Sequence, residues 1–284
     1  MPNNASLPTA LRLPRKRLRA VERLAVPVGD TINQWSWLKA ATRPLWRYLG
    51  KNFVTILSKN LYEVHGAEHL RSVDAPGGIV LVANHRSFFD LFFTGATMID
   101  TRASLIQRMI FPVRKDFFYD HPVGFFINVA LTSASMWPPI FRDERRREFN
   151  PIAMAQIGRS MRKGTLCGIH PEGTRGNGPD PYALGKAKPG VGQLLLSASP
   201  DVMVQPAWIL GMSNDFVGTA RRNFRPAGQR GEPVRIWFGP AIRAGDLVER
   251  CGKDPQAIAE AIMEHVAALG ELDRAHRAAN PRSA

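Results

Sequence analysis

Cysteine is scarce in this chain of 284 residues, and its scarcity excludes one class of fold. Two cysteines, Cys167 and Cys251, cannot make the framework of several disulfides that holds small secreted domains together. With 44% hydrophobic residues, a chain of this length has enough apolar side chains for one substantial core without cross-links. We therefore expect a single soluble domain in a reducing cytoplasm.

The chain also lacks a long apolar run. Its longest stretch without a charged residue, residues 122–141, contains Asn128, several hydroxyl side chains and the pair Pro138–Pro139. Such a stretch is a poor bilayer span, and we expect it to form a buried helix that leads into a strand. The polar and then basic N-terminus has no continuous apolar core of the kind that a signal peptide needs. These features predict a cytoplasmic protein.

Acidic residues are few relative to basic ones, 24 against 38, which gives a net charge of +14. Such an excess indicates an anionic partner. Nucleic acid is one candidate, but the basic residues are spread along the chain and no recognisable nucleic-acid module accompanies them. We favour an anionic membrane surface, near which each lysine or arginine contributes about 1 kcal/mol. The expected location is therefore cytoplasmic, with peripheral attachment to a membrane.

Residues 1–60 are expected to form a basic segment with amphipathic helices. Aromatic and basic side chains alternate from residue 32 to residue 49, and Pro44 should break or kink a helix there. The aromatic side chains either lie in a membrane interface or pack on the core, and the sequence leaves both interpretations open. The basic residues of the segment's first half are Arg12, Arg15, Lys16, Arg17, Arg19 and Arg23, and the interleaved residues of its second half are Trp35, Trp37, Lys39, Arg43, Trp46, Arg47 and Tyr48.

The first cluster of chemically active side chains follows an aliphatic strand predicted at residues 79–82. Asn84 and His85 come next, and Asp90 follows five positions after the histidine. Five residues of helix rotate by ~500°, so these two side chains meet only if His85 lies in a turn and Asp90 in the first helical turn, with Ser87 as N-cap. Asp90 would then fix the imidazole tautomer and leave the other nitrogen free to take a proton. Alternatively, His85 satisfies turn hydrogen bonds and Asp90 complements the helix dipole.

The second cluster follows another strand, predicted at residues 165–169. It reads His170-Pro-Glu-Gly-Thr-Arg175, where glycine lets the backbone approach a ligand and Arg175 offers a planar fork of donors suited to phosphate. A solvated surface turn is the alternative.

Strands that alternate with helical stretches predict an α/β fold, a single domain with a mixed, mostly parallel central sheet flanked by helices and preceded by the basic and aromatic N-terminal segment. In such sheets, chemistry gathers at the carboxyl ends of the strands. Three further strands are predicted, at residues 61–64, 202–206 and 234–238.

Together the two clusters resemble motifs of the glycerolipid acyltransferase family, which includes the 1-acyl-glycerol-3-phosphate acyltransferases. The family's Asn-His-x-Ser-x-x-Asp motif is present as Asn84, His85, Ser87 and Asp90, and its Pro-Glu-Gly-Thr-Arg motif is intact at residues 171–175. The similarity covers about residues 62–242. It implies an acyltransferase domain at residues 61–243, followed by a C-terminal helix and flexible tail at residues 244–284.

The resemblance also implies residues that bind the acceptor. The family's second motif ends in a phosphate-binding arginine, for which Arg142 is the first choice and Arg145 the second; the paired prolines before Arg142 are a departure that leaves the register open. Most of the charged residues at positions 142–148 are expected to form a solvated helical cluster. The remaining implied binding residues are Glu172, which would orient glycerol, and Gly173, Thr174 and Arg175.

The function implied is transfer of a fatty acyl chain from a thioester, either acyl-CoA or acyl-carrier protein, to a lysophospholipid hydroxyl. With 1-acyl-glycerol 3-phosphate as acceptor, the product is phosphatidic acid. His85 and Asp90 would be catalytic, with Asn84 in support and Ser87 as a helix cap rather than a nucleophile; no metal or redox cofactor is implied. The alternatives are another acceptor, such as glycerol 3-phosphate, a different lysophospholipid or a lyso-ornithine lipid, or a non-catalytic lipid-binding protein.

One competing pattern is His65-Gly-Ala-Glu-His69, which matches a zinc-peptidase motif. That chemistry needs both histidines on one face of a helix, whereas Gly66 follows the strand predicted at residues 61–64. We therefore do not assign peptidase chemistry to it.

Overall fold

The computed structural model describes residues 17–102 and 106–280. Arg12, Arg15, Lys16 and residues 281–284 of the predicted tail lie outside them. The helices are α1 (Glu22–Gln34), α2 (Ser36–Pro44), the π-helical η2 (Leu45–Gly50), α3 (Lys51–Ile56), α4 (Ala67–Arg71), α5 (Asp90–Arg102), α6 (Lys115–Phe118), α7 (Pro122–Thr132), α8 (Phe149–Ser160), α9 (Gly190–Leu196), α10 (Phe216–Asn223), the 3-10 helix η3 (Ala227–Gln229), α11 (Ala244–Arg250) and α12 (Pro255–Ala279). The strands are β1 (Tyr62–His65), β2 (Ile79–Ala83), β3 (Arg108–Ile110), β4 (Val113–Arg114), β5 (Pro139–Ile140), β6 (Thr165–Ile169), β7 (Met203–Leu210), β8 (Val234–Phe238) and β9 (Ile242–Arg243).

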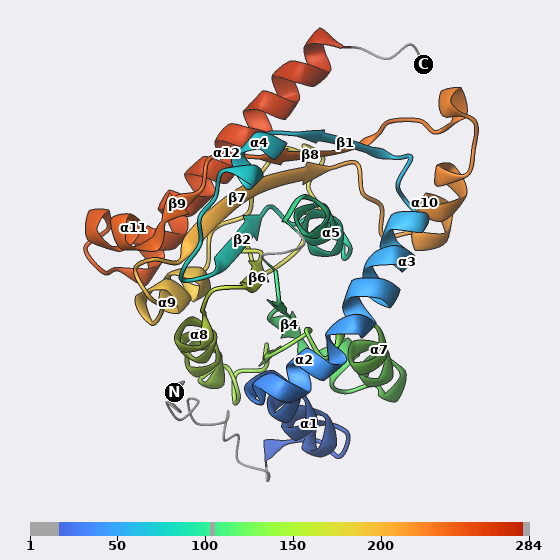
Figure 1. Cartoon of the computed structure of the whole chain (residues 1–284). Helices are drawn as coiled ribbons and strands as arrows, with labels where there is room; N and C mark the ends of the chain where they lie inside the picture. The colour runs from blue at the N-terminus through green and yellow to red at the C-terminus, as the bar shows by residue number, and fades with distance from the viewer. Residues whose placement is uncertain (1–16, 103–105, 281–284) are drawn as a thin grey trace.

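A seven-stranded sheet forms the centre of the molecule, in the order β1-β8-β7-β2-β6-β3, with β9 paired to β7 (Figure 1). β2 runs parallel to both β7 and β6, β3 runs parallel to β6, and β1 runs parallel to β8. Within residues 17–102 and 106–280, the antiparallel pairs are those that β7 makes with β8 and β9. The mixed, mostly parallel sheet predicted from the sequence is confirmed, as are the helices that flank it and precede it. β4 and β5 form a separate parallel pair.

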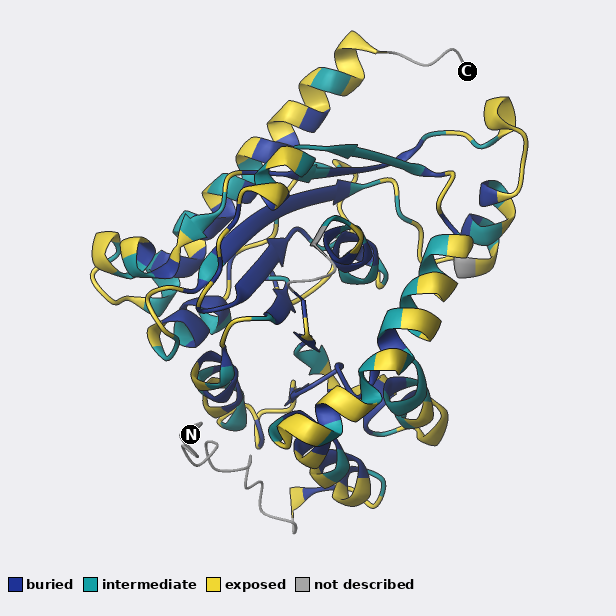
Figure 2. Ribbon diagram, viewed as in Figure 1, coloured by how far each residue is buried: buried dark blue, intermediate teal, exposed yellow. Residues whose placement is uncertain are grey.

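The buried strands lie where unbroken aliphatic runs predict them. All five residues of β2 and all five of β6 are buried, as is typical of strands covered on both faces (Figure 2). Successive side chains of β2 enter opposite halves of the core, Leu81 with α5 on one face and Val80 with α8, α9 and α12 on the other. The strands predicted at 165–169 and 234–238 are confirmed with those bounds. The strand predicted at 202–206 runs on to Leu210, because residues 207–210 pair with β8.

The aromatic residues of the N-terminal helices divide between the two interpretations. Trp46 is only 2% exposed, so it packs on the core. Trp35, Trp37 and Tyr48 are exposed on the surface. At Pro44 the α-helical pattern ends, and the chain continues through the π-helical η2 into α3. Lys39 does not face an interface, because its Nζ is buried and donates to the Ser133 carbonyl at 2.6 Å.

The uncharged run at residues 122–141 does form a helix that leads into a strand, but the prediction that the helix is buried was wrong. In α7 only Gly124, Asn128 and Thr132 are buried, while Val123 and Phe126 are 56% and 69% exposed. The inward face of α7 is the polar one, since Asn128 bonds both the N–H and the carbonyl of Met136. No helix in residues 17–102 and 106–280 is long and apolar enough to cross a membrane.

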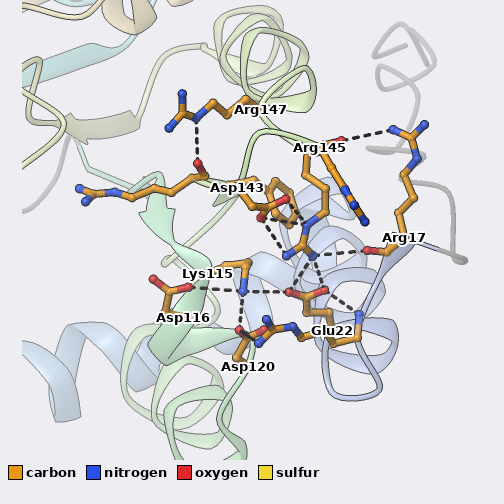
Figure 3. Close-up of polar contacts among 12 residues, drawn as sticks. Arg17, Glu22, Lys115, Asp116, Asp120, Asp143, Arg145 and Arg147 are labelled. Atoms are coloured by element: carbon orange, nitrogen blue, oxygen red, sulfur yellow. Dashed lines mark hydrogen bonds and ion pairs between the residues drawn. The ribbon is translucent and has the colours of Figure 1, made fainter.

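A buried cluster of charges holds α1 against the rest of the molecule (Figure 3). The fully buried carboxylate of Glu22 accepts from Arg146 at 2.8 Å, lies 3.3 Å from Lys115 Nζ and accepts from the Arg19 backbone N–H at 2.7 Å. The prediction that residues 142–148 form a solvated helical cluster was therefore wrong for Arg146, which is buried in a turn rather than exposed on a helix. Its burial follows from its pairing with Glu22.

Candidate active site

Three parallel strands end at one edge of the sheet and bring together segments that are far apart in the sequence. Val82 of β2 lies beside Ile169 of β6 and Pro206 of β7. The residues that follow these strands therefore meet at the carboxyl edge, where α/β sheets place their binding sites. They are Asn84 and His85 after β2, residues 170–175 after β6, and Ser213 and Asn214 after β7.

Asn84 fixes the turn that carries His85. Its buried amide mimics a backbone group: Nδ2 donates to the Ile209 carbonyl at 2.9 Å, and Oδ1 accepts from the Ile209 N–H at 2.8 Å. The turn is thus tied to β7 at the point where β2 ends.

His85 and Asp90 meet in the geometry that the sequence requires. His85 lies in the turn and Asp90 opens α5, so that His85 Nδ1 is 3.3 Å from Asp90 Oδ2. The same carboxylate oxygen accepts the backbone N–H groups of Arg86 and Ser87, each at 2.7 Å. These bonds hold the carboxylate toward the imidazole, and His85 Nε2 is the ring nitrogen left for a substrate proton.

Ser87 is bound within the turn, but it is not the N-cap of α5. Its hydroxyl accepts from the Phe89 N–H at 3.2 Å and donates to the Ser213 carbonyl at 3.1 Å. The helix begins two residues later than this cap would place it, because residues 86–89 form the turn around the Asp90 carboxylate.

Burial sets the protonation of the pair. It lowers the pKa of His85 to about 4, an effect that the positive charges of Arg175 and Arg142 reinforce. Burial likewise raises the pKa of Asp90 to about 6, against the opposing effect of its bonds from Arg86 and Ser87. Near neutral pH the site therefore contains a neutral imidazole beside an ionised carboxylate, as a general base requires.

His170 is a site residue that sequence reasoning missed. Its ring stacks on that of His85, with centroids 3.9 Å apart and planes 10° apart. Its Nδ1 lies 2.9 Å from the Ala83 carbonyl, which can only accept, so this nitrogen carries the proton. Burial lowers the pKa of His170 to about 3, so the ring stays neutral and limits the rotation of His85. The available signal was a histidine within two residues of the end of each of two neighbouring strands.

Glu172 clamps the backbone of His85. One carboxylate oxygen accepts from the His85 N–H at 2.7 Å and the other from the Gly185 N–H at 2.6 Å, and the residue is only 2% exposed. The Gly176 N–H donates to the His85 carbonyl at 2.8 Å. The loop after β6 thus holds both backbone polar groups of His85.

Two arginines project at the same edge. Arg142 donates to the Gly173 carbonyl at 2.7 Å, and Arg175 donates to Asn214 Oδ1 at 2.9 Å; both arginines are exposed. Gly173 has a φ of +64°, a left-handed conformation that favours glycine and that presents this carbonyl to Arg142.

Arg145, the second choice for a phosphate ligand, lies instead beside Arg17, whose guanidinium donates to the Arg145 carbonyl (Figure 3). Thr174 is exposed on the loop. Asn214 was not predicted, although its place just after β7 is the kind of position where site residues gather; it also accepts from the Phe88 N–H at 2.9 Å.

A model of the family described as acyltransferase matches residues 62–210, more than half of the chain. The matched region includes the turn of His85, the loop of Glu172 and Arg175, and Arg142. The chain belongs to the acyltransferase family. The prediction of a glycerolipid acyltransferase is thus confirmed at the level of the family, and the acyltransferase acts on an acyl donor and an acceptor. A comparison with curated proteins found no match.

His85, Asp90 and His170 also offer metal-ligand atoms that lie within 4.8 Å of one another. Asp90 Oδ2 accepts two backbone N–H groups and faces His85 Nδ1, whereas Asp90 Oδ1 has no hydrogen-bond partner.

Proposed function

We propose that the protein transfers a fatty acyl chain from a thioester, acyl-CoA or acyl-carrier protein, to the free hydroxyl of 1-acyl-glycerol 3-phosphate, giving phosphatidic acid. One observation carries the proposal: the neutral imidazole of His85, oriented by Asp90, lies next to the exposed cations Arg142 and Arg175. A base for a hydroxyl and a binding site for a phosphate are thereby adjacent. Residues 61–243 constitute the acyltransferase domain in this proposal.

In the proposed reaction, His85 Nε2 removes the proton from the acceptor hydroxyl while that oxygen attacks the thioester carbonyl. The new C–O bond forms as the carbonyl π electrons move to the oxygen, and backbone N–H groups stabilise the resulting oxyanion. The C–S bond then breaks, and the imidazolium returns the proton to the departing thiolate. Direct transfer of this kind needs no nucleophilic serine, which agrees with the Ser87 hydroxyl donating to a backbone carbonyl.

The residues of the loop after β6 divide into two roles. Glu172 is a positioning residue, because both of its oxygens bind backbone N–H groups and neither is left to orient glycerol. Arg175 and Arg142 bind the acceptor phosphate, with Gly173 and Thr174 shaping the loop between them. Arginine suits this task because its planar fork of donors matches phosphate oxygens.

We predict that Arg175→Ala raises the KM for lysophosphatidic acid by about 10-fold or more, since a hydrogen bond to a charged group is worth about 1.5–3 kcal/mol. The KM for a neutral acceptor such as monoacylglycerol should change much less. Arg142→Ala should change the two KM values in the same way as Arg175→Ala. Arg145→Ala is the matched control, because this exposed arginine lies beside Arg17 and should leave both KM values unchanged. Equal losses with the charged and the neutral acceptor would contradict a phosphate-binding role.

We also predict that acyl transfer declines as the pH falls through about 6, the pKa of Asp90. Above this value the carboxylate is ionised and accepts from His85 Nδ1; below it Asp90 takes up a proton and the imidazole loses that acceptor. The ring itself stays neutral here, because the pKa of His85 is about 4. The profile of kcat/KM against pH measures the effect. The Asp90→Asn variant should transfer the acyl chain slowly, and its pH profile should lack the inflection near pH 6. A wild-type rate that is constant from about pH 7 to about pH 5 would exclude this role for Asp90.

We further propose that the N-terminal helices attach the enzyme to an anionic membrane surface. Large apolar side chains are exposed on α2, η2, α3 and α7. They form one surface because η2 packs against α7. Phe88, in the turn after His85, is also exposed, and its ring lies 6.3 Å from that of Phe117 on α6, which connects this surface to the active site. An acceptor with a fatty chain could then reach His85 from the bilayer. The surface consists of Trp37, Tyr48, Leu49, Phe53 and Ile56 on α2–α3 and of Val123 and Phe126 on α7.

The pair Trp37→Glu and Phe126→Glu should weaken co-sedimentation with phosphatidylglycerol vesicles by about 10-fold or more, because it removes apolar contact and adds negative charge. Ile152→Glu is the matched control, since Ile152 is 53% exposed on α8, away from α3 and α7 (Figure 1). If all of these variants bind vesicles like the wild type, this surface is not the site of attachment.

A further inference from the structure

A second cluster of metal-ligating side chains lies at the far edge of the sheet, three strands from β2. Glu63 and His65 come from the edge strand β1, and His276 comes from near the end of α12. Glu63 Oε1 lies 3.1 Å from His65 Nε2 and 3.0 Å from His276 Nε2, so one carboxylate oxygen faces both imidazoles. The three ligand atoms all lie within 4.8 Å of one another.

The fold holds these side chains in place. Glu63 and His65 are two residues apart on a strand, so both point to the same face of the sheet. The ring of His65 stacks on Trp237, with centroids 4.0 Å and planes 13° apart, and Trp237 Nε1 is held by Asp273 Oδ1 at 2.9 Å. The orientation of His65 is therefore set by packing rather than by its contact with Glu63 alone.

The charges around the cluster leave Glu63 to the two histidines. Arg235 lies on β8 beside Glu63 of β1. Its side chain donates to Asp273 at 2.8 Å and pairs with Glu232 at 3.3 Å. Arg277, next to His276, also pairs with Glu232. The nearby cations are thus matched by other carboxylates, and a cation at the cluster would face one carboxylate and two imidazoles.

We propose that Glu63, His65 and His276 bind Zn²⁺ through Oε1 and the two Nε2 atoms, with water as the fourth ligand. Zinc bonds of about 2.0–2.1 Å to these ligands place tetrahedral neighbours about 3.3 Å apart, close to the separations of both histidine nitrogens from Glu63. On binding, each imidazole keeps its proton on Nδ1. The ion fastens the end of α12 to the edge strand across 213 residues of sequence. This site is distinct from the peptidase pattern, because His69 lies in α4 and is not one of the three ligands.

Calorimetric titration of the EDTA-treated, dialysed full-length protein with ZnCl2 tests the proposal. The wild type should bind one Zn²⁺, and its melting temperature should rise by about 5 °C at ~100 times the dissociation constant. His276→Ala and Glu63→Gln should each weaken binding by about 100-fold or more, since loss of a ligand costs more than the ~10–100-fold typical of residues that support a ligand. Glu63→Gln retains the size of the side chain, and circular dichroism of each variant verifies its fold.

His69→Ala and His85→Ala are the matched controls, and both should bind Zn²⁺ like the wild type. Loss of zinc from His69→Ala with retention in His276→Ala would overturn the proposal in favour of the peptidase pattern. Loss from His85→Ala with retention in His276→Ala would overturn it by placing the ion at the active site. Absence of binding to the wild type would also overturn it.

Discussion

Replacing His85 by alanine should lower the turnover number for acyl transfer by about 10²–10⁴-fold, the contribution of a well-placed general base. In the wild type, Asp90 orients the ring, His170 stacks on it, and burial keeps it neutral. Alanine retains the backbone N–H that Glu172 accepts and the carbonyl that Gly176 binds, so the turn keeps its bonds to the loop after β6. We therefore expect lost catalysis in a folded protein, measured as thiol release from palmitoyl-CoA with lysophosphatidic acid.

His121→Ala is the control for this variant. His121 is an exposed residue that precedes α7 and makes no side-chain cap bond there, so its removal should leave turnover unchanged. If His85→Ala retains most of the wild-type rate, His85 is not the base, and the assignment of Asp90 as its partner is lost as well.

Replacing Glu22 by alanine should lower the free energy of unfolding by about 3–5 kcal/mol, the cost of removing one partner from a buried ion pair. Arg146 and Lys115 would remain buried without the carboxylate that lies between them (Figure 3). Arg146 would keep Asp143, and Lys115 would keep Asp120, but both cations would lose the buried carboxylate between them and retain the desolvation cost of their positions. Urea denaturation followed by circular dichroism measures the change.

Glu148→Ala is the matched control for Glu22→Ala. Glu148 pairs with Arg17, but the two side chains are 61% and 51% exposed, and surface ion pairs typically contribute about 0–1 kcal/mol. Equal, small losses for both variants would show that the Glu22 cluster does not hold α1 in place.

Local sequence predicted the sheet and the meeting of His85 with Asp90. Both depend on short-range rules: five buried aliphatic residues favour a strand, and the rotation of a helix limits where Asp90 can lie. The stacking of His170 on His85 and the bond from the His85 N–H to Glu172 depend on strand register instead. Glu172 and His85 are 87 positions apart in the sequence. Sequence spacing contains no information about that register.

Composition also failed to predict which face of a helix is buried. The lack of charge in residues 122–141 favoured a buried helix, yet α7 turns Asn128 inward and Phe126 outward. Asn128 is buried because it satisfies backbone groups of the segment that follows, a bond that only the fold reveals. Likewise, the charges of residues 142–148 looked solvated because the partner of Arg146 is 124 positions away.

The most direct test of the account is an assay of the purified wild-type enzyme with palmitoyl-CoA and lysophosphatidic acid, with palmitoyl-acyl-carrier protein as the second donor. Released thiol and lipid products are quantified in the same reaction, and the lipids are identified by mass spectrometry. The account predicts thiol release that requires the acceptor and matches the phosphatidic acid formed mole for mole. Thiol release without an acceptor, or no phosphatidic acid with either donor, would contradict it.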